Sequence, residues 1–150
     1  MAVRELGESD LDALLALYED LHSKDDPSPA RSSVEHTWES ILAGAGSHCL
    51  GHFEEGKLVS SCALTVVPNL TRGCRPYALV ENVVTQTKHR RKGYATAVLR
   101  HALELAWSQQ CYKVMLLTGR TDDGVVAFYE AAGFQPDVKR GFVALPGAGL

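Results

Sequence analysis

The clearest chemical signal in this sequence is a basic turn that ends in a glycine. Residues 88–92 read KHRRK, and Gly93 follows them. An apolar, strand-like run precedes the turn, and an alanine-rich stretch without proline or glycine follows it for fifteen residues. Where a strand passes into a helix in this way, unpaired backbone N–H groups, the positive end of the helix dipole and cationic side chains come together. The turn is therefore predicted to bind an anion such as a phosphate group.

A solvated basic turn is the alternative interpretation. For any single one of its Lys and Arg side chains this alternative is the simpler one, because exposed charges contribute little. For the turn as a unit we favour a binding site, because Gly93 has no Cβ and lets a ligand approach the main chain closely. His89 is interpreted as a surface residue of the same turn.

The composition limits what else the chain does. With 150 residues, of which 45% are hydrophobic, the chain is long enough to bury the core of one domain over residues 1–150. The formal net charge of -3 argues against a nucleic-acid partner. No run approaches the roughly 20 apolar residues of a membrane span, and the N-terminus lacks the features of a signal peptide. We therefore expect a cytoplasmic protein without a membrane partner.

The cysteines and histidines show no pattern of a metal site. The four cysteines form no CxxC pair and have no ligand spacing with histidine. Neither a metal ion nor a disulfide framework is expected, and the sequence leaves open whether the cysteines have a redox role.

The elements that position the basic turn follow from periodicity. A strand is predicted over residues 3–6, then a helix from Ser9, its N-cap, to about residue 22. Residues 23–33 are predicted to form a loop, and Ser32 with Glu35 is a capping-box pattern that opens a helix over residues 34–43. Residues 47–54 and 57–67 flank Glu55-Gly56 and indicate an antiparallel hairpin. A loop over residues 68–73 and a strand over 77–85 follow.

Beyond the basic turn, the chain alternates between helix and strand. An amphipathic helix is predicted over residues 93–109, and the apolar run 112–118 indicates a strand buried on both faces. Asp122 or Asp123 is expected to cap a helix that ends at Gly133, and residues 141–145 indicate a last strand. Because a strand-helix-strand crossover places its strands locally, the strands on either side of the 93–109 helix are predicted to be parallel neighbours in an α/β mixed sheet.

Two stretches carry a resemblance to a known family. Residues 90–95 read RRKGYA, which has the form R-x-x-G-x-A, and residues 127–134 read AFYEAAGF. With these motifs and its element order, the chain resembles the GCN5-related N-acetyltransferases (GNAT superfamily), whose signature is Q/R-x-x-G-x-G/A at a strand-to-helix junction. The resemblance implies a central, splayed, mixed β-sheet flanked by helices. Residues 80–85 and 111–116 are most similar to the glucosamine-6-phosphate N-acetyltransferases, although Glu81-Asn82 replaces a Glu-Asp pair and Thr118-Gly119 replaces Asp-Cys.

The resemblance implies that acetyl-CoA is the acetyl donor. Its pyrophosphate would lie on the basic turn and on the first turn of the helix, and its pantetheine arm would pair with the preceding strand. Asp122 stands where many members carry an asparagine that contacts the coenzyme. The cofactor-binding residues implied in this way are Val83, Val84, Thr85, Arg90, Arg91, Lys92, Gly93, Tyr94, Ala95, Thr96 and Asp122.

Three groups would carry the chemistry of acyl transfer. The N–H of Val84 would hold the thioester oxygen, Glu81 would accept a proton from the amine, and Tyr129 would protonate the leaving thiolate. Each has a structural alternative: Val84 as a core residue, Glu81 as a carboxylate paired with Arg75, and Tyr129 as a core aromatic.

The resemblance therefore implies transfer of an acetyl group to the primary amine of a small molecule by direct attack. Acetylation of a protein N-terminus or lysine, and a non-catalytic acyl-CoA sensor, remain alternatives. Arg31, Arg72 and Arg75 are expected to line the acceptor side, and an anionic acceptor would follow if they converge. A homodimer and a monomer are both compatible with the sequence.

Overall fold

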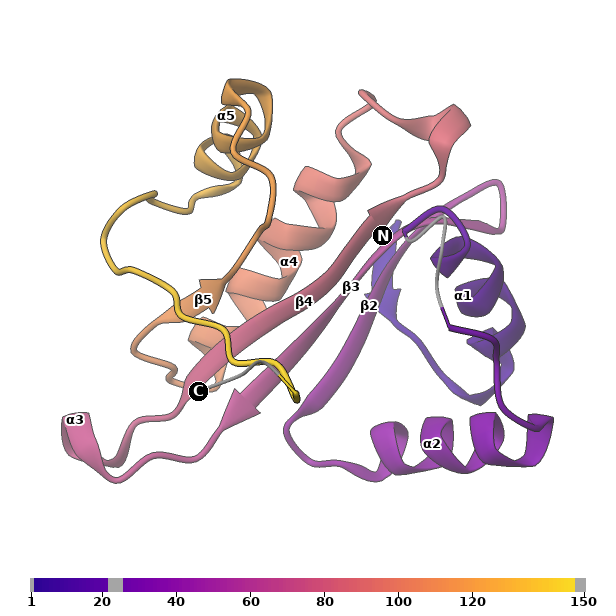
Figure 1. Cartoon of the computed structure of the whole chain (residues 1–150), viewed down its shortest axis with the longest axis horizontal. Helices are drawn as coiled ribbons and strands as arrows, with labels where there is room; N and C mark the ends of the chain where they lie inside the picture. Colours follow the sequence, from indigo (N-terminus) through magenta and orange to yellow (C-terminus); the bar gives the residue numbers. More distant parts are fainter. Residues whose placement is uncertain (1, 22–25, 148–150) are drawn as a thin grey trace.

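Five strands form one mixed sheet in the order β1-β2-β3-β4-β5, in which the first four strands are antiparallel and β5 runs parallel to β4 (Figure 1). The structure, a computed structural model, describes residues 2–21 and 26–147. The α/β mixed sheet and the parallel pairing across the crossover helix are as predicted. The elements are β1 (Val3–Glu5), the 3-10 turn η1 (Glu8–Asp10), α1 (Leu11–Tyr18), α2 (Arg31–Ala43), β2 (Ser47–Glu54), β3 (Lys57–Val67), α3 (Thr71–Cys74), β4 (Tyr77–Thr85), the 3-10 turn η2 (Thr87–His89), α4 (Tyr94–Ser108), β5 (Val114–Leu116) and α5 (Asp123–Ala132).

Each face of the sheet carries its own core. Leu50 and Leu64 belong to a cluster with Leu99 of α4, and Phe128 of α5 packs against it. On the other face, Cys49 belongs to a cluster with residues of α1 and α2 such as Trp38. Because successive strand residues point to opposite faces, neighbours such as Cys49 and Leu50 enter different cores. The sheet is therefore a partition between an α4–α5 layer and an α1–α2 layer (Figure 1).

The hairpin β2–β3 has the predicted bounds and the predicted turn. Glu55 and Gly56 both have positive φ, 49° and 76°. This backbone is typical of a two-residue hairpin loop whose twist matches the strands that it joins. The sharp turn fixes the register in which Glu54 faces Lys57.

β4 and β5 pair over only three residues, from Ala78↔Val114 to Val80↔Leu116. The sequence predicted a longer strand over residues 112–118, buried on both faces, and this prediction is wrong. β5 lies at the edge of the sheet, its residues are half-buried, and Leu117 beyond it is 59% exposed. Since β5 leaves β4 after Leu116, the far half of β4 has a free edge on this side.

Two predicted helix starts differ from the structure. At the first helix, the polar contact comes from Asp10 and not from the predicted N-cap Ser9. The carboxylate of Asp10 accepts the N–H of Gly7 at 2.8 Å. Asp10 is the last residue of η1, and α1 begins at Leu11. The predicted end of this helix near residue 22 lies outside the described residues, and α1 ends at Tyr18. The second helix begins at Arg31 without a side-chain cap.

The Ser32 capping box does not form, because the helix begins at Arg31 and Ser32 lies inside it. Glu35 is bound instead by Arg31 one turn earlier, at 3.0 Å. The predicted loop over residues 68–73 contains the start of the short α3. Residues 141–145 do not form the predicted last strand. A strand needs a neighbour to pair with, and Phe142 in this segment is 88% exposed.

None of the helices in the described part of the chain combines the length and the apolar character needed to span a bilayer. Within residues 2–21 and 26–147, no group of three His, Cys, Asp or Glu side chains is arranged to hold a metal ion.

Candidate functional site

A cavity of about 920 Å³ opens where β4 and β5 diverge; we call it the sheet-edge cavity. The far half of β4, the Gly93 turn, the loop after β5 and α5 form its walls. The structure therefore brings together segments that are separated by up to about fifty residues in the sequence. Of the predicted site residues, all but Lys92 line it: Glu81, Val83, Val84, Thr85, Arg90, Arg91, Gly93, Tyr94, Ala95, Thr96, Asp122 and Tyr129.

A β-bulge in β4 decides which main-chain groups face this cavity. Glu81 is paired with Ala63 and Val84 with Ser61, so two residues of β4, Asn82 and Val83, oppose a single residue of β3. Asn82 has a positive φ of 53°, as bulged residues often do. The bulge turns the side chain of Val83 to the α4–α5 core while Val84 packs in the α1–α2 core.

The bulge also determines which way the N–H of Val84 points, the group that was expected to hold the thioester oxygen. The carbonyl of Val84 accepts a hydrogen bond from Ser60 Oγ at 3.0 Å, and Gln86 N–H donates to the carbonyl of Val59 at 2.9 Å. The N–H and C=O of one strand residue point to the same side, and this side alternates along the strand. The N–H of Val84 therefore faces β3, whereas Val83 and Thr85 present their main-chain groups to the opening.

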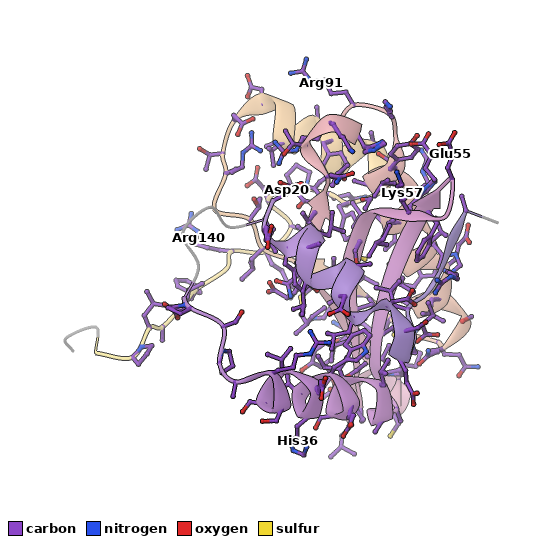
Figure 2. All side chains as sticks on the ribbon, turned by 90° about the vertical axis from the view of Figure 1, so that its right-hand side faces the viewer. Asp20, His36, Glu55, Lys57, Arg91 and Arg140 are labelled. Carbon is purple, nitrogen blue, oxygen red and sulfur yellow. The ribbon has the colours of Figure 1, made fainter. Side chains whose placement is uncertain are left out.

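The Gly93 turn has the backbone of an anion site. Gly93 has φ of 82°, and a Cβ placed on it would meet no heavy atom within 4 Å. The first intrahelical bond of α4 runs from Ala97 N–H to the carbonyl of Gly93 at 3.0 Å. The N–H groups of residues 94–96 therefore have no partner within the helix and are free to bind a ligand. Arg91 projects outward from this turn at the top of Figure 2.

Neighbouring segments hold the turn in place. The phenol of Tyr94 donates a hydrogen bond to Glu54 at the end of β2, and Nδ1 of His89 lies 3.0 Å from the same carboxylate. The hydrogen bond from Tyr94 is the main cause of a lowered pKa at Glu54, and it raises the pKa of Tyr94 in turn. The carboxylate of Asp20, after α1, accepts the N–H of Thr87 at 3.2 Å (Figure 2).

Tyr129 and Glu81 approach the sheet-edge cavity from opposite walls. Tyr129 is half-buried on α5, with ring centroids 4.8 Å from Phe128 and 6.2 Å from Phe134. Burial raises the pKa of Tyr129, the positive charge of Arg120 opposes this rise, and the carboxylate of Glu81 adds to it. The phenol therefore remains protonated and able to donate a proton at neutral pH.

The structural alternative for Glu81 is not observed. Arg75, its expected partner, donates through Nε to the carbonyl of Arg72 at 3.1 Å, and its guanidinium lies 5.8 Å from the ring centroid of Tyr112. Among the described residues, no salt bridge reaches Glu81. Its side chain is exposed to the cavity instead.

Sequence reasoning missed Arg120. It lines the sheet-edge cavity and forms a salt bridge with Asp122 at 3.2 Å. Asp122 also accepts the N–H of Val125 at 3.3 Å as the N-cap of α5. The carboxylate of Asp122 thus has two partners within the chain. The signal that could have identified Arg120 is its position, as a basic residue in the loop after a parallel strand and just before a helix cap.

A second cavity, of about 520 Å³, lies on the other face of the sheet between α1, α2 and strands β2–β4; we call it the α1–α2 cavity. It shares two lining residues with the sheet-edge cavity, Glu81 and Asn82. The side chain of Asn82 hydrogen-bonds with Tyr18 of α1, whose pKa burial raises to about 12. The bulged part of β4 is therefore the wall between the two cavities.

The three arginines expected on the acceptor side do not converge. Arg31 binds the carboxylates of Asp12 at 2.7 Å and Glu35 at 3.0 Å. Arg72 and Arg75 both lie over the ring of Tyr112, near the opposite end of β4. None of the three lines either cavity. The condition for predicting an anionic acceptor is therefore not met.

Comparisons with known proteins show which family and which fold this chain shares. The sequence model of the acetyltransferase (GNAT) family matches residues 11–134. A glucosamine 6-phosphate N-acetyltransferase of Trypanosoma brucei brucei is 31% identical over 138 residues, which is 90% of this chain and 89% of the relative. A candidate acetyltransferase from Agrobacterium tumefaciens str. C58 is similar in structure with a TM-score of 0.90 at 43% identity, covering 97% of this chain and 99% of that one. A glucosamine-6-phosphate N-acetyltransferase from Arabidopsis thaliana, 22% identical, shares the fold with a TM-score of 0.80 over 95% of this chain and 96% of its own.

Proposed function

Because the chain belongs to the acetyltransferase (GNAT) family, we propose that it transfers an acetyl group from acetyl-CoA to the primary amine of a small molecule. The chain is a GNAT N-acetyltransferase, and this family uses acetyl-CoA. One observation carries the proposal: the Gly93 turn, the free edge of β4 and Tyr129 all line the sheet-edge cavity.

The donor lies along the sheet-edge cavity in this proposal. Its pyrophosphate binds the free N–H groups at the start of α4, helped by the positive charge of Arg90 and Arg91. Its pantetheine arm pairs like an added strand with the main chain of Val83 and Thr85. Lys92, which does not line the cavity, contributes only through its charge.

The chemistry needs an oxyanion donor, a base and an acid. The amine nitrogen attacks the thioester carbon, and the charge that develops on the carbonyl oxygen is stabilised by an N–H of the free edge. Val83 replaces Val84 in this role, because the Val84 N–H faces β3. Glu81 accepts the proton that the amine releases. The C–S bond then breaks, and Tyr129 gives its proton to the sulfur.

A small-molecule acceptor is supported by two observations. The T. brucei relative is named for a small amine, glucosamine 6-phosphate. The α1–α2 cavity, at about 520 Å³, has a volume typical of small-ligand sites and meets the sheet-edge cavity at Glu81.

The test measures thiol release from acetyl-CoA with a panel of primary amines, and measures acetyl-CoA binding separately by calorimetry. The panel also includes a peptide that has a free N-terminus and a lysine. We expect turnover with at least one small amine and no acetylation of the peptide. Preference for the peptide would replace the small-molecule acceptor with a protein acceptor. Tight coenzyme binding without turnover of any amine would make the chain a sensor and would contradict the proposal.

A further inference from the structure

We infer that the acceptor enters through the α1–α2 cavity and is a primary amine with an uncharged, apolar body, an inference that rests on the proposed acetyl transfer. Glu81 and Asn82 form the inner end of this cavity, where it meets the sheet-edge cavity. An amine that fills the α1–α2 cavity therefore presents its nitrogen where the acetyl group is proposed to lie.

Apolar side chains form most of the α1–α2 cavity. One wall comes from α1, the opposite wall from α2, and the floor from β2, β3 and β4. Burying apolar ligand surface against such walls is favourable in proportion to the area removed from water. The apolar side chains that line it are Leu11, Leu14, Leu15, Pro29, Val34, Trp38, Ile41, Ala63 and Leu64.

The charge of the cavity argues against an anionic acceptor. No Lys or Arg is among its lining residues in the described part of the chain. His48 is a lining residue, but its ring faces the other side of the sheet, where it contacts Glu5 at 2.5 Å and Gln109 at 3.2 Å. Arg31, the first residue of α2, already binds two carboxylates. A phosphate placed here would lose its hydration without gaining a cationic partner among the described residues, which is costly.

Two polar groups in the cavity are available to the amine. Glu81 is the one carboxylate among the lining residues that the structure describes, and it suits an ammonium group at the inner end. Trp38 is 5% exposed, and its indole Nε1 has no hydrogen-bond partner among the described residues. A neutral acceptor atom on the ligand would satisfy this N–H, since buried donors without partners are unfavourable.

The experiment compares two amines that share a 2-aminoethyl arm: 2-phenylethylamine, with an apolar body, and O-phosphoethanolamine, with a phosphate. The expected kcat/KM is higher for 2-phenylethylamine by about tenfold to a hundredfold, from burial of one aromatic ring. Glucosamine 6-phosphate is the third substrate. A higher kcat/KM for either phosphorylated amine would overturn the inference and leave the proposed acetyl transfer intact.

A matched pair of variants tests the location. Thr37 lines the cavity from α2, whereas the neighbouring His36 points away from the body of the protein (Figure 2). Thr37→Arg should lower kcat/KM for 2-phenylethylamine and raise it for O-phosphoethanolamine, each by about tenfold. His36→Arg adds the same charge to the same helix and should change neither. Equal effects of the two variants would place the acceptor elsewhere and overturn the inference.

A binding readout separates this inference from the chemistry. In a Trp107→Phe protein, Trp38 is the remaining tryptophan and reports on the α1–α2 cavity. Saturable quenching of its fluorescence by 2-phenylethylamine, but not by O-phosphoethanolamine, is expected without acetyl-CoA present. If 2-phenylethylamine binds in this way but no amine is acetylated, the proposed function is wrong while the cavity binds as inferred. If amines are acetylated but Trp38 does not respond, the inference is wrong and the function stands.

Discussion

The phenol of Tyr94 donates a hydrogen bond to the carboxylate of Glu54, and this contact joins the first residue of α4 to the last residue of β2. The ring of Tyr94 also lies against His52, with 4.5 Å between ring centroids. It adds to the two other contacts that hold this positively charged turn, from His89 to Glu54 and from the N–H of Thr87 to Asp20. The β2–β3 hairpin thus supports the Gly93 turn through Glu54 and His52.

Removing this support should weaken donor binding without stopping the chemistry. Tyr94→Phe keeps the ring contact with His52 and loses the hydrogen bond to Glu54. We expect the Kd for acetyl-CoA to rise about threefold, as is typical of one partly exposed polar contact, and kcat to change little. Calorimetry and steady-state rates measure the two effects. A larger loss in kcat than in affinity would show that Tyr94 acts in the reaction itself.

Two substitutions of Gly93 separate shape from charge. Asn and Asp both tolerate a positive φ better than other side chains, and they differ by one negative charge. If a pyrophosphate binds this turn, Gly93→Asp should lose acetyl-CoA affinity by at least about tenfold relative to Gly93→Asn. Added salt should reduce the difference, because it screens exposed charges. Equal affinities in the two variants would rule out a phosphate at this turn.

Tyr129→Phe tests the general acid. Turnover should fall by about a hundredfold or more, the usual contribution of a positioned acid, while acetyl-CoA affinity stays the same. Tyr112→Phe, a change outside both cavities, is the control and should have little effect. An unchanged rate in Tyr129→Phe would show that Tyr129 is not the general acid and that water protonates the thiolate.

The pH dependence of the rate of the natural protein is a second test of Tyr129 as the general acid. Burial raises its pKa above the ordinary value of 10.0, so its acid form persists through the neutral range. The rate should therefore show no loss from ionisation of Tyr129 until the pH exceeds 10.0. A decline that begins near neutral pH and is absent in Tyr129→Phe would contradict this.

Asp10 should make the fold sensitive to acid. Hydrogen bonds from Arg4, at 2.8 and 3.0 Å, are the main cause of its lowered pKa, and burial opposes them. A carboxyl group with a depressed folded-state pKa stabilises the fold above its unfolded pKa of about 3.9, and this contribution disappears as the pH falls through the folded value. Asp10→Asn should lower the free energy of unfolding at pH 7 by about 1–3 kcal/mol.

Denaturant titrations at several pH values measure this effect. Asp10→Asn should also lose less stability than the natural protein on acidification below about pH 4. Asp12→Asn is the matched control, because the Asp12 side chain is 80% exposed and its salt bridge with Arg31 is on the surface. Parallel acid curves for the natural protein and Asp10→Asn would contradict the assignment.

Hydrophobic periodicity and turn-forming residues correctly predicted the helices and strands whose bounds depend on local sequence. The β2–β3 hairpin, β4 and α4 follow from alternation, Glu55-Gly56 and an amphipathic stripe, and their bounds agree with the structure to within a residue. β5 differs because an apolar run does not reveal whether it will have one neighbour or two. The Ser32 cap does not form because the helix begins one residue earlier, at Arg31, whose side chain binds Glu35, a contact that a capping pattern does not describe.

For the candidate site too, local features could be predicted from the sequence and long-range contacts could not. The Gly93 turn and Tyr129 lie in short motifs, and both line the sheet-edge cavity. Contacts between distant segments could not be read from spacing: Tyr18 with Asn82, the unpartnered Nε1 of Trp38, and the bulge that turns the N–H of Val84 toward β3. The first two depend on how α1 and α2 pack on the sheet, and the third on the register between β3 and β4, so all three are tertiary properties.

The free edge of β4 has a consequence for how this enzyme changes over evolutionary time. Peptide groups are the same whatever side chains they carry, so a donor held by main chain tolerates substitution along β4. Helices α1 and α2 of the opposite layer supply two walls of the α1–α2 cavity, and their lining side chains can change without disturbing the free edge, apart from those that contact the bulged part of β4, as Tyr18 does. With donor and acceptor bound as proposed, new acceptors can therefore be acquired by changes in α1 and α2 that leave the bulge of β4 in place, while the donor site stays constant.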